Sequence, residues 1–149
     1  MKYLLLLASV AFYHVANAQS AEDSVKAAVN QLFTAMRDAD SASLIRSFAD
    51  SAILQTIVNN KEGKVEIRNE STAVFAGFIN KQQKGFADER IAFDMLRIDG
   101  PLAIVWASYK FYYKGKFSHC GVDSFQLVRV NGKWEIQYLI DTRRMQGCE

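Results

Sequence analysis

Two side chains in the second half of the sequence, Asp123 and His119, could take part in proton transfer. They lie four residues apart in a predicted strand, so both side chains point to the same face, roughly 13 Å apart at strand rise. That separation is too long for direct contact but suits two groups on either side of one bound ligand. A carboxyl in apolar surroundings has a raised pKa and stays protonated, and a histidine titrates near neutrality. The pair therefore predicts acid–base groups. The structural alternatives are a hydrogen-bonded Asp123 and a His119 at the rim.

Two tight turns predict which residues face this pair. Lys114-Gly115 and Asn131-Gly132 each suit a two-residue hairpin turn. Counting outward from them puts Trp106 opposite Asp123 and Lys110 opposite His119. The residues predicted to bind a ligand on this face are Trp106, Ser108, Lys110, Tyr138 and Arg144. Lys110 and Arg144 would form a cationic rim for an acidic ligand and would favour a neutral His119. A bulge in either long strand would swap the faces beyond it.

The opposite face of these strands is expected to form a dimer interface. It would carry Val105, Ala107, Tyr109, Phe111, Tyr113 and Val122. An apolar surface of this size is rarely left exposed on a soluble monomer. The sequence therefore predicts a homodimer that buries this face.

The two cysteines, Cys120 and Cys148, are expected to form a disulfide. The same counting places Cys120 opposite Arg143, so the tail must fold back, and Gly147 permits such a turn. A loop of roughly 29 residues would contribute about 3–4 kcal/mol in the chain-entropy description. The alternative is two free thiols.

These residues need a scaffold of helices followed by strands. Apolar spacing predicts an amphipathic helix over 21–37 and a shorter one through Leu44, Ile45 and Phe48. A strand at 52–58 and its return at 64–68 precede a third helix that starts at 70–72. Four long strands follow, over 86–98, 102–113, 116–130 and 133–144.

This order, with Trp134 just after the last tight turn, resembles the nuclear transport factor 2-like (NTF2-like) superfamily. The resemblance covers 21–144 and is carried by Leu44 to Ala52 (LIRSFADSA) and Phe125 to Ile136 (FQLVRVNGKWEI). The stretch from Trp106 to Asp123 is similar to a small secreted bacterial branch. The superfamily includes SnoaL-like cyclases, ketosteroid isomerases and scytalone dehydratases. The resemblance implies an α+β fold in which three N-terminal helices pack on a strongly curved, mostly antiparallel sheet. That sheet forms a cone around a pocket.

The resemblance also implies a role for Asp123. In ketosteroid isomerases, a protonated Asp on the matching strand donates a hydrogen bond to an oxyanion. Their general base lies on the first strand, where residues 52–57 hold no carboxylate, and the predicted first helix holds no Tyr. Steroid isomerisation is therefore not expected.

The start of the chain predicts export. Lys2 is followed by a largely apolar run to Val15 and by small residues at 16 and 18, the pattern of a signal peptide cleaved after Ala18. The mature protein would be one domain over 19–149, secreted or periplasmic, without a membrane anchor, in an oxidising compartment.

Composition and motifs narrow the functional classes. The formal net charge is only +2 for 149 residues, which gives no case for binding nucleic acid. No spacing of metal ligands and no nucleotide or cofactor motif is present, so no metal or cofactor is expected. The sequence favours an exported domain that binds a small, partly apolar molecule. The alternatives are a cofactor-independent cyclase, isomerase or dehydratase that uses Asp123 and His119, and a structural or protein-interaction module.

Overall fold

The computed structural model describes residues 21–148, so the predicted signal peptide and its cleavage point lie outside the described residues. The N-terminal helix, described over 21–38, buries the face that carries Val25, Val29 and Leu32, each at most 1% exposed. The positive φ of Ala39 turns the chain into α2 (Ser41–Ile45), where Asp40 caps the helix by accepting the N–H of Ser43 at 2.9 Å.

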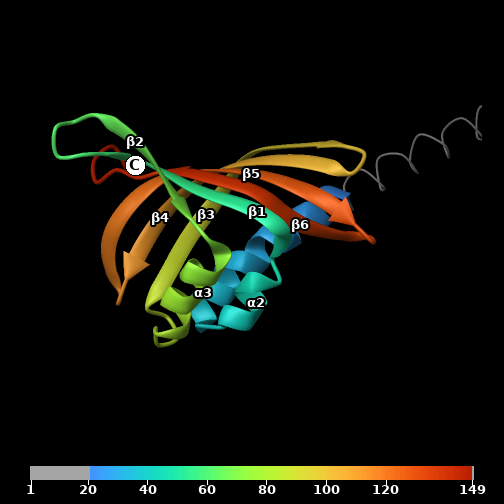
Figure 1. Cartoon of the computed structure of the whole chain (residues 1–149), viewed down its shortest axis with the longest axis horizontal. Helices are drawn as coiled ribbons and strands as arrows, with labels where there is room; N and C mark the ends of the chain where they lie inside the picture. Colours follow the sequence, from blue (N-terminus) through green and yellow to red (C-terminus); the bar gives the residue numbers. More distant parts are fainter. Residues whose placement is uncertain (1–20, 149) are drawn as a thin grey trace, which may run out of the picture.

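Six strands form one curved sheet, with helices on its concave side (Figure 1). The chain enters the sheet through β1 (Phe48–Asn59) and β2 (Val65–Glu70), and α3 (Thr72–Asn80) follows. The long meander is β3 (Ala87–Asp99), β4 (Leu102–Tyr113), β5 (Lys116–Val130) and β6 (Lys133–Thr142). The sheet order is β2-β1-β6-β5-β4-β3, and only the β1–β6 pair is parallel. The predicted α+β cone is confirmed.

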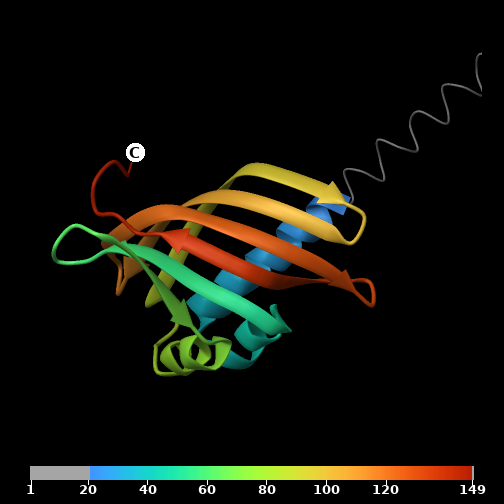
Figure 2. The same ribbon diagram turned by 45° about the horizontal axis from the view of Figure 1, so that its top comes forward.

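The core lies between the N-terminal helix and the inner face of the sheet, where this helix crosses beneath the strands (Figure 2). Phe33 meets Phe125 edge-on at 6.1 Å between ring centroids, and Leu127 and Ile136 are fully buried beside them. The indole N–H of Trp134 donates to Ser24 at 3.1 Å, which joins the last hairpin to the first helix. Within the described residues, no helix combines the length and apolarity needed to cross a membrane.

The predicted pairing is correct next to the two turns and wrong beyond them. Tyr113 pairs with Lys116 and Val130 with Lys133, as expected. A bulge then shifts β4 against β5, so that Phe111, not Lys110, lies opposite His119. A second bulge, between Gln126 and Leu127, shifts β5 against β6. Each extra residue moves the side chains that follow to the other face.

The predicted ligand-binding face on β4 and the end of β6 was therefore wrong. Trp106, Ser108, Lys110, Tyr138 and Arg144 lie on the outer side of the sheet, and Trp106 is 45% exposed. The part of the predicted dimer face on β4 was wrong for the same reason, whereas Val122, which pairs with Ser108, lies on the outer side as expected. Val105, Ala107 and Tyr109 are at most 4% exposed and belong to the interior, together with Phe111.

The predicted disulfide is present. Cys120 and Cys148 are joined, with their Cα atoms 5.7 Å apart. The residue opposite Cys120 is Arg144, not the expected Arg143, and the two backbones exchange N–H···O bonds of 2.9 Å in both directions. The tail is thus fastened to β5 both covalently and by hydrogen bonds.

The homodimer stays a prediction, now with other residues at its centre. Trp106 and Met95 form a cross-strand pair on the outer face and are 45% and 39% exposed. We expect light scattering at micromolar concentration to give twice the mature mass, and Trp106→Glu to give a monomer, because an apolar interface disfavours a buried charge. Val74→Glu, at an exposed position of α3, is the control and should remain dimeric. A monomeric unsubstituted protein would contradict the prediction.

Candidate functional site

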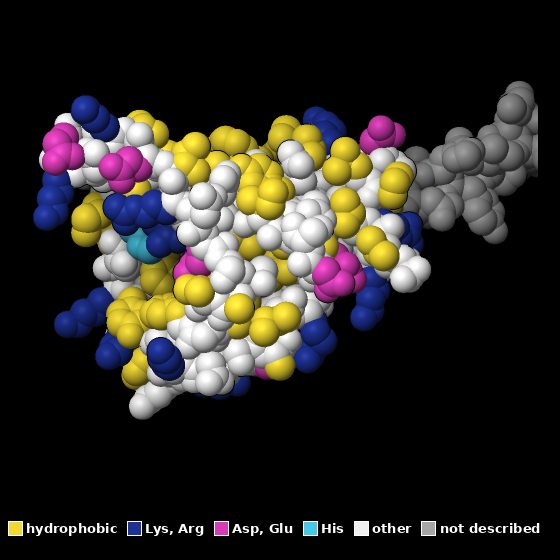
Figure 3. Space-filling model, in the orientation of Figure 1, with side chains coloured by type: hydrophobic (Ala, Val, Ile, Leu, Met, Phe, Trp, Pro, Cys, Tyr) yellow, Lys and Arg dark blue, Asp and Glu magenta, His cyan; other side chains and the backbone are white. Residues whose placement is uncertain are grey.

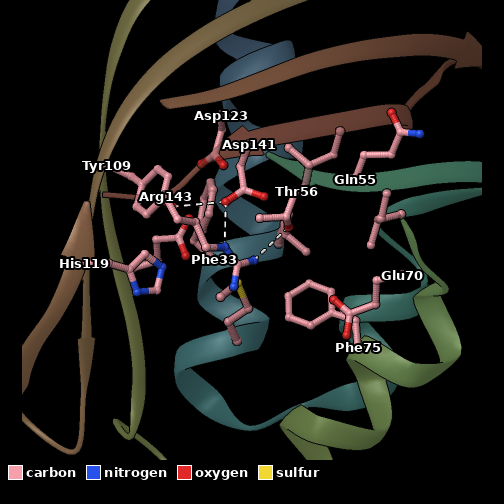
Figure 4. Close-up of a pocket in the computed structure, with 15 residues that line it drawn as sticks. Phe33, Gln55, Thr56, Glu70, Phe75, Tyr109, His119, Asp123, Asp141 and Arg143 are labelled. Atoms are coloured by element: carbon pink, nitrogen blue, oxygen red, sulfur yellow. Dashed lines mark hydrogen bonds and ion pairs between the residues drawn. The ribbon is translucent and has the colours of Figure 1, made fainter. Parts of the chain in front are cut away.

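A pocket penetrates the cone between the sheet and the helices. Its inner part has a volume of about 70 Å³ and continues into an outer part of about 270 Å³. Both parts share Met36, Glu70, Phe75, Glu89, His119 and Arg143 in their walls. In Figure 4 the polar side chains of the sheet face the aromatic side chains of the helices across this space. The pocket therefore has one apolar wall and one polar wall.

Asp123 is the buried polar group at the base of the pocket. It is 3% exposed, and its Oδ2 atom has no hydrogen-bond donor among the described residues. The carboxyl of Glu89, from β3, lines the same pocket and interacts with the carboxyl of Asp123. Two ionised carboxylates only accept, so one of the two must be protonated for them to bond to each other.

Burial raises the pKa of both acids. Burial, then the charge of Glu89, raises the pKa of Asp123 well above its ordinary value. Burial raises the pKa of Glu89 from 4.5 to about 7. The two carboxyls titrate as one pair, which at neutral pH holds at least part of a shared proton.

Arg143 balances the acids from the end of β6. Its Nε donates to Oδ2 of Asp141 at 2.8 Å, and its Nη2 donates to the hydroxyl of Thr56 at 3.1 Å (Figure 4). The hydroxyl of Tyr109 donates towards the same Asp141 oxygen at 3.1 Å and the Thr142 carbonyl at 2.9 Å. Oδ2 of Asp141 therefore already accepts from two donors, whereas Oδ2 of Asp123 accepts from none among the described residues.

Gly121 makes room for this network. A Cβ atom on Gly121 would overlap the Thr142 carbonyl oxygen and lie 2.8 Å from a ring carbon of Tyr109. Only a residue without a side chain lets Tyr109 pass over β5 to reach the end of β6.

His119 stands at the side of the pocket against two aromatic rings. Its ring lies 5.0 Å from that of Phe111 and 5.7 Å, edge-on, from that of Tyr109. Its Nδ1 is 3.0 Å from the hydroxyl of Ser118. Burial, then the nearby charge of Arg143, lowers the pKa of His119, so the ring is neutral at pH 7.

The entrance lies between the sheet and α3. In Figure 3 it is a hollow where basic side chains and a histidine lie beside apolar side chains. Glu70, at the end of β2, lines it with Phe75 and Phe78 of α3. Burial raises the pKa of the Glu70 carboxyl.

The structure divides the sequence-predicted site residues into three groups. His119 and Asp123 line the same pocket, as expected. Ser108, Lys110 and Arg144 gather in a different depression, on the outer side of the sheet. Trp106 and Tyr138 line neither.

Sequence reasoning missed the groups that surround Asp123. These are Glu89, Tyr109, Asp141 and Arg143. Counting from the two turns places the last three on the outer face, because the bulges have no clear mark in the sequence. Glu89 could have been found, because it lies two residues before inward-facing Ile91 in β3 and therefore points to the same face. Among residues 21–148, no three His, Cys, Asp or Glu side chains form a group that could hold a metal ion.

Comparisons with known proteins agree on the fold. The family described as "Putative lumazine-binding" matches residues 20–137. An NTF2-like protein of unknown function from Shewanella baltica superposes with a TM-score of 0.65 at 16% identity, covering 85% of this chain and 96% of that one. One from Methylobacillus flagellatus gives 0.65 at 15% identity, over 85% and 94%. At such identities the likeness shows the fold alone. A comparison with curated proteins finds no match.

The close contacts around Gly121 predict that a single added methyl group destabilises the protein. Gly121→Ala should lower the free energy of unfolding by about 1–3 kcal/mol, because backbone must move to admit the methyl group. Gly77→Ala is the control: this exposed helical glycine has open space around it, so the change should stabilise α3 by about 0.5–1 kcal/mol. Urea unfolding measures both. Equal effects at the two positions would contradict the close approach.

The raised pKa of Glu89 predicts a pH-dependent stability. Between pH 4.5 and 7 the folded chain keeps a proton that the unfolded chain has released, so this group makes the free energy of unfolding fall as the pH rises. In Glu89→Gln that fall should become shallower. Glu62→Gln, in an exposed turn, is the control and should follow the unsubstituted protein. Identical pH profiles for Glu89→Gln and the unsubstituted protein would show that the carboxyl pair does not form.

Proposed function

Because the chain belongs to the lumazine-binding-like family of the NTF2-like superfamily, we propose that it binds a small, partly apolar molecule inside the cone. The observation that carries the proposal is the Oδ2 atom of Asp123, a buried acceptor without a donor. A buried polar atom without a partner costs free energy, and native proteins rarely retain one without a reason. A ligand N–H or O–H group would satisfy this atom.

The walls of the pocket limit the shape and polarity of the ligand. Phe33 and Phe75 offer flat apolar surfaces, while Asp123 and Glu89 require hydrogen-bond donors at the buried end. Arg143 lines both parts of the pocket and can bond a carbonyl oxygen of the ligand. A flat heteroaromatic molecule that carries both N–H groups and carbonyl oxygens meets these requirements. Lumazine, which the family description names, is such a molecule and is a suitable probe.

Acid–base catalysis in the same pocket is the second candidate. It is favoured by the pairing of Asp123 with Glu89, because one carboxyl can hold a proton while the other is free to accept one. This supplies the second titratable group that Asp123 needs, in addition to His119. An isomerase, cyclase or dehydratase of this kind would need no cofactor. Turnover of a bound carbonyl compound distinguishes it from simple binding.

We also propose that the chain is exported. The disulfide is consistent with an oxidising compartment, where a chain processed after Ala18 would begin at Gln19. The ligand would then be one that reaches the protein outside the cytoplasm.

Lumazine fluorescence titration tests the proposed binding. Asp123→Asn should weaken the affinity roughly fivefold to hundredfold, because an amide N–H₂ group in place of Oδ2 would leave the donor of the ligand unpaired, which costs about 1–3 kcal/mol. Asp50→Asn, exposed on β1, is the matched control and should bind as the unsubstituted protein does. The melting temperature of each variant shows whether it is folded.

Native mass spectrometry of the protein from its host separates a wrong probe from a wrong site. If lumazine fails but a co-purified molecule is present and is lost in Asp123→Asn, the pocket is right and the ligand is another. If neither molecule depends on Asp123, the proposed site is wrong.

A further inference from the structure

A second depression lies on the outer side of the sheet, which we call the outer groove. It has a volume of about 290 Å³ and runs over β3, β4 and β5 to the C-terminal tail. Its polar lining residues are Arg90, Ser108, Lys110, Tyr112 and Arg144, and no Asp or Glu lines it. The groove therefore gathers three positive charges from three separate segments.

These basic residues stand in one row across the sheet. Arg90 pairs directly with Lys110, Lys110 pairs with Cys120, and Cys120 bridges to Arg144. Like charges directly opposite each other in an antiparallel pair are destabilising. The disulfide to Cys148 then fastens the tail and adds a third cation to the same row. This row of like charges destabilises the fold, yet a disulfide holds it in place. Such a conflict indicates a functional site.

Of the three cations in this row, only Arg90 is neutralised by a carboxylate. Asp88 bonds Nε of Arg90 at 2.8 Å and also contacts Arg37 at 3.9 Å. Asp94 accepts the backbone N–H of Ser108 at 2.9 Å and faces its hydroxyl at 3.3 Å. Among residues 21–148, neither Lys110 nor Arg144 forms an ion pair. Two of the three cations thus keep their charge available.

Two contacts fix the position of the Arg90 guanidinium. Its guanidinium lies 4.3 Å from the ring centroid of Tyr112, while Asp88 fixes its Nε atom. Both terminal nitrogens of the guanidinium remain for an oxyanion, in the planar arrangement that suits carboxylate or phosphate. Arg144 is fixed in a similar way, since its Nε donates to the carbonyl of Gly147 at 3.2 Å.

We propose that the outer groove binds a small oxyanion, a carboxylate or phosphate group, between Arg90, Lys110 and Arg144. The bound anion lies among the three cations and relieves their repulsion. The same ligand is rejected by the inner pocket, whose walls hold Glu70, Glu89, Asp123 and Asp141 against Arg143. The site is separate from the proposed small-molecule pocket and does not depend on it.

Thermal unfolding with added inorganic phosphate tests the proposal, with sodium chloride of equal ionic strength as the reference and acetate as the carboxylate arm. Phosphate at about ten times its Kd should raise the melting temperature of the full chain by roughly 4 °C over chloride. An increase with phosphate alone identifies a phosphate group, and an increase with acetate identifies a carboxylate.

Lys110→Gln has two expected effects. Without the anion its melting temperature should equal or exceed that of the unsubstituted protein, because the repulsion from Arg90 is removed, and the anion-dependent increase should be lost. Lys133→Gln, at the exposed start of β6, is the matched control and should keep the full increase. Asp123→Asn should keep it too, which separates this site from the inner pocket.

Amide chemical shifts locate the anion independently of stability. Saturable changes at Arg90, Ser108 and Lys110 on addition of phosphate or acetate would support the outer groove. The proposal is overturned if both anions act no differently from chloride, or if Lys110→Gln responds to them as fully as Lys133→Gln does.

Discussion

The alternation of side chains along the strands, and its interruption by bulges, decides what each face of this protein can do. A strand carries its residues to opposite faces with a period of two, so a single extra residue reassigns every side chain beyond it. The bulges between β4 and β5 and between β5 and β6 bring Tyr109, Asp141 and Arg143 inside. Without them the buried carboxyl of Asp123 would face Trp106 instead of a polar network.

The same alternation separates charge between the two sides of one sheet. Along β3, Glu89 points inward and Arg90 outward, and at the end of the chain Arg143 lines the inner pocket while Arg144 lines the outer groove. Adjacent residues thus point into two different environments, one on each side of the same sheet. The inside is acidic, and burial raises the pKa of two of its carboxyls, Glu89 and Asp123. The outer groove is basic and has no carboxyl in its lining.

The fold and the disulfide could be predicted from the sequence because their signals are local and strong. Asn131-Gly132 and Lys114-Gly115 occupy the expected hairpin turns with positive φ, and the pairing nearest each turn is correct. His119 and Asp123 were placed correctly because both lie on the same side of the bulge in β5. Trp106, Lys110 and Arg144 were misplaced because bulges depend on sheet curvature and packing, which leave no short motif. Glu89 was overlooked although its strand was found, because no distant partner is visible in a linear sequence.

The last strand of the chain occupies the middle of the sheet. β6 is the element that connects the pair β1–β2 to the meander β3–β5, because it lies between β1 and β5. The cone therefore cannot close until the C-terminal residues have left the ribosome, and the earlier segments must wait as separate pieces. A chain of this topology has many contacts between residues distant in sequence, which slows folding. Such a delay keeps the polypeptide extended for longer, before the cone can close around its pocket.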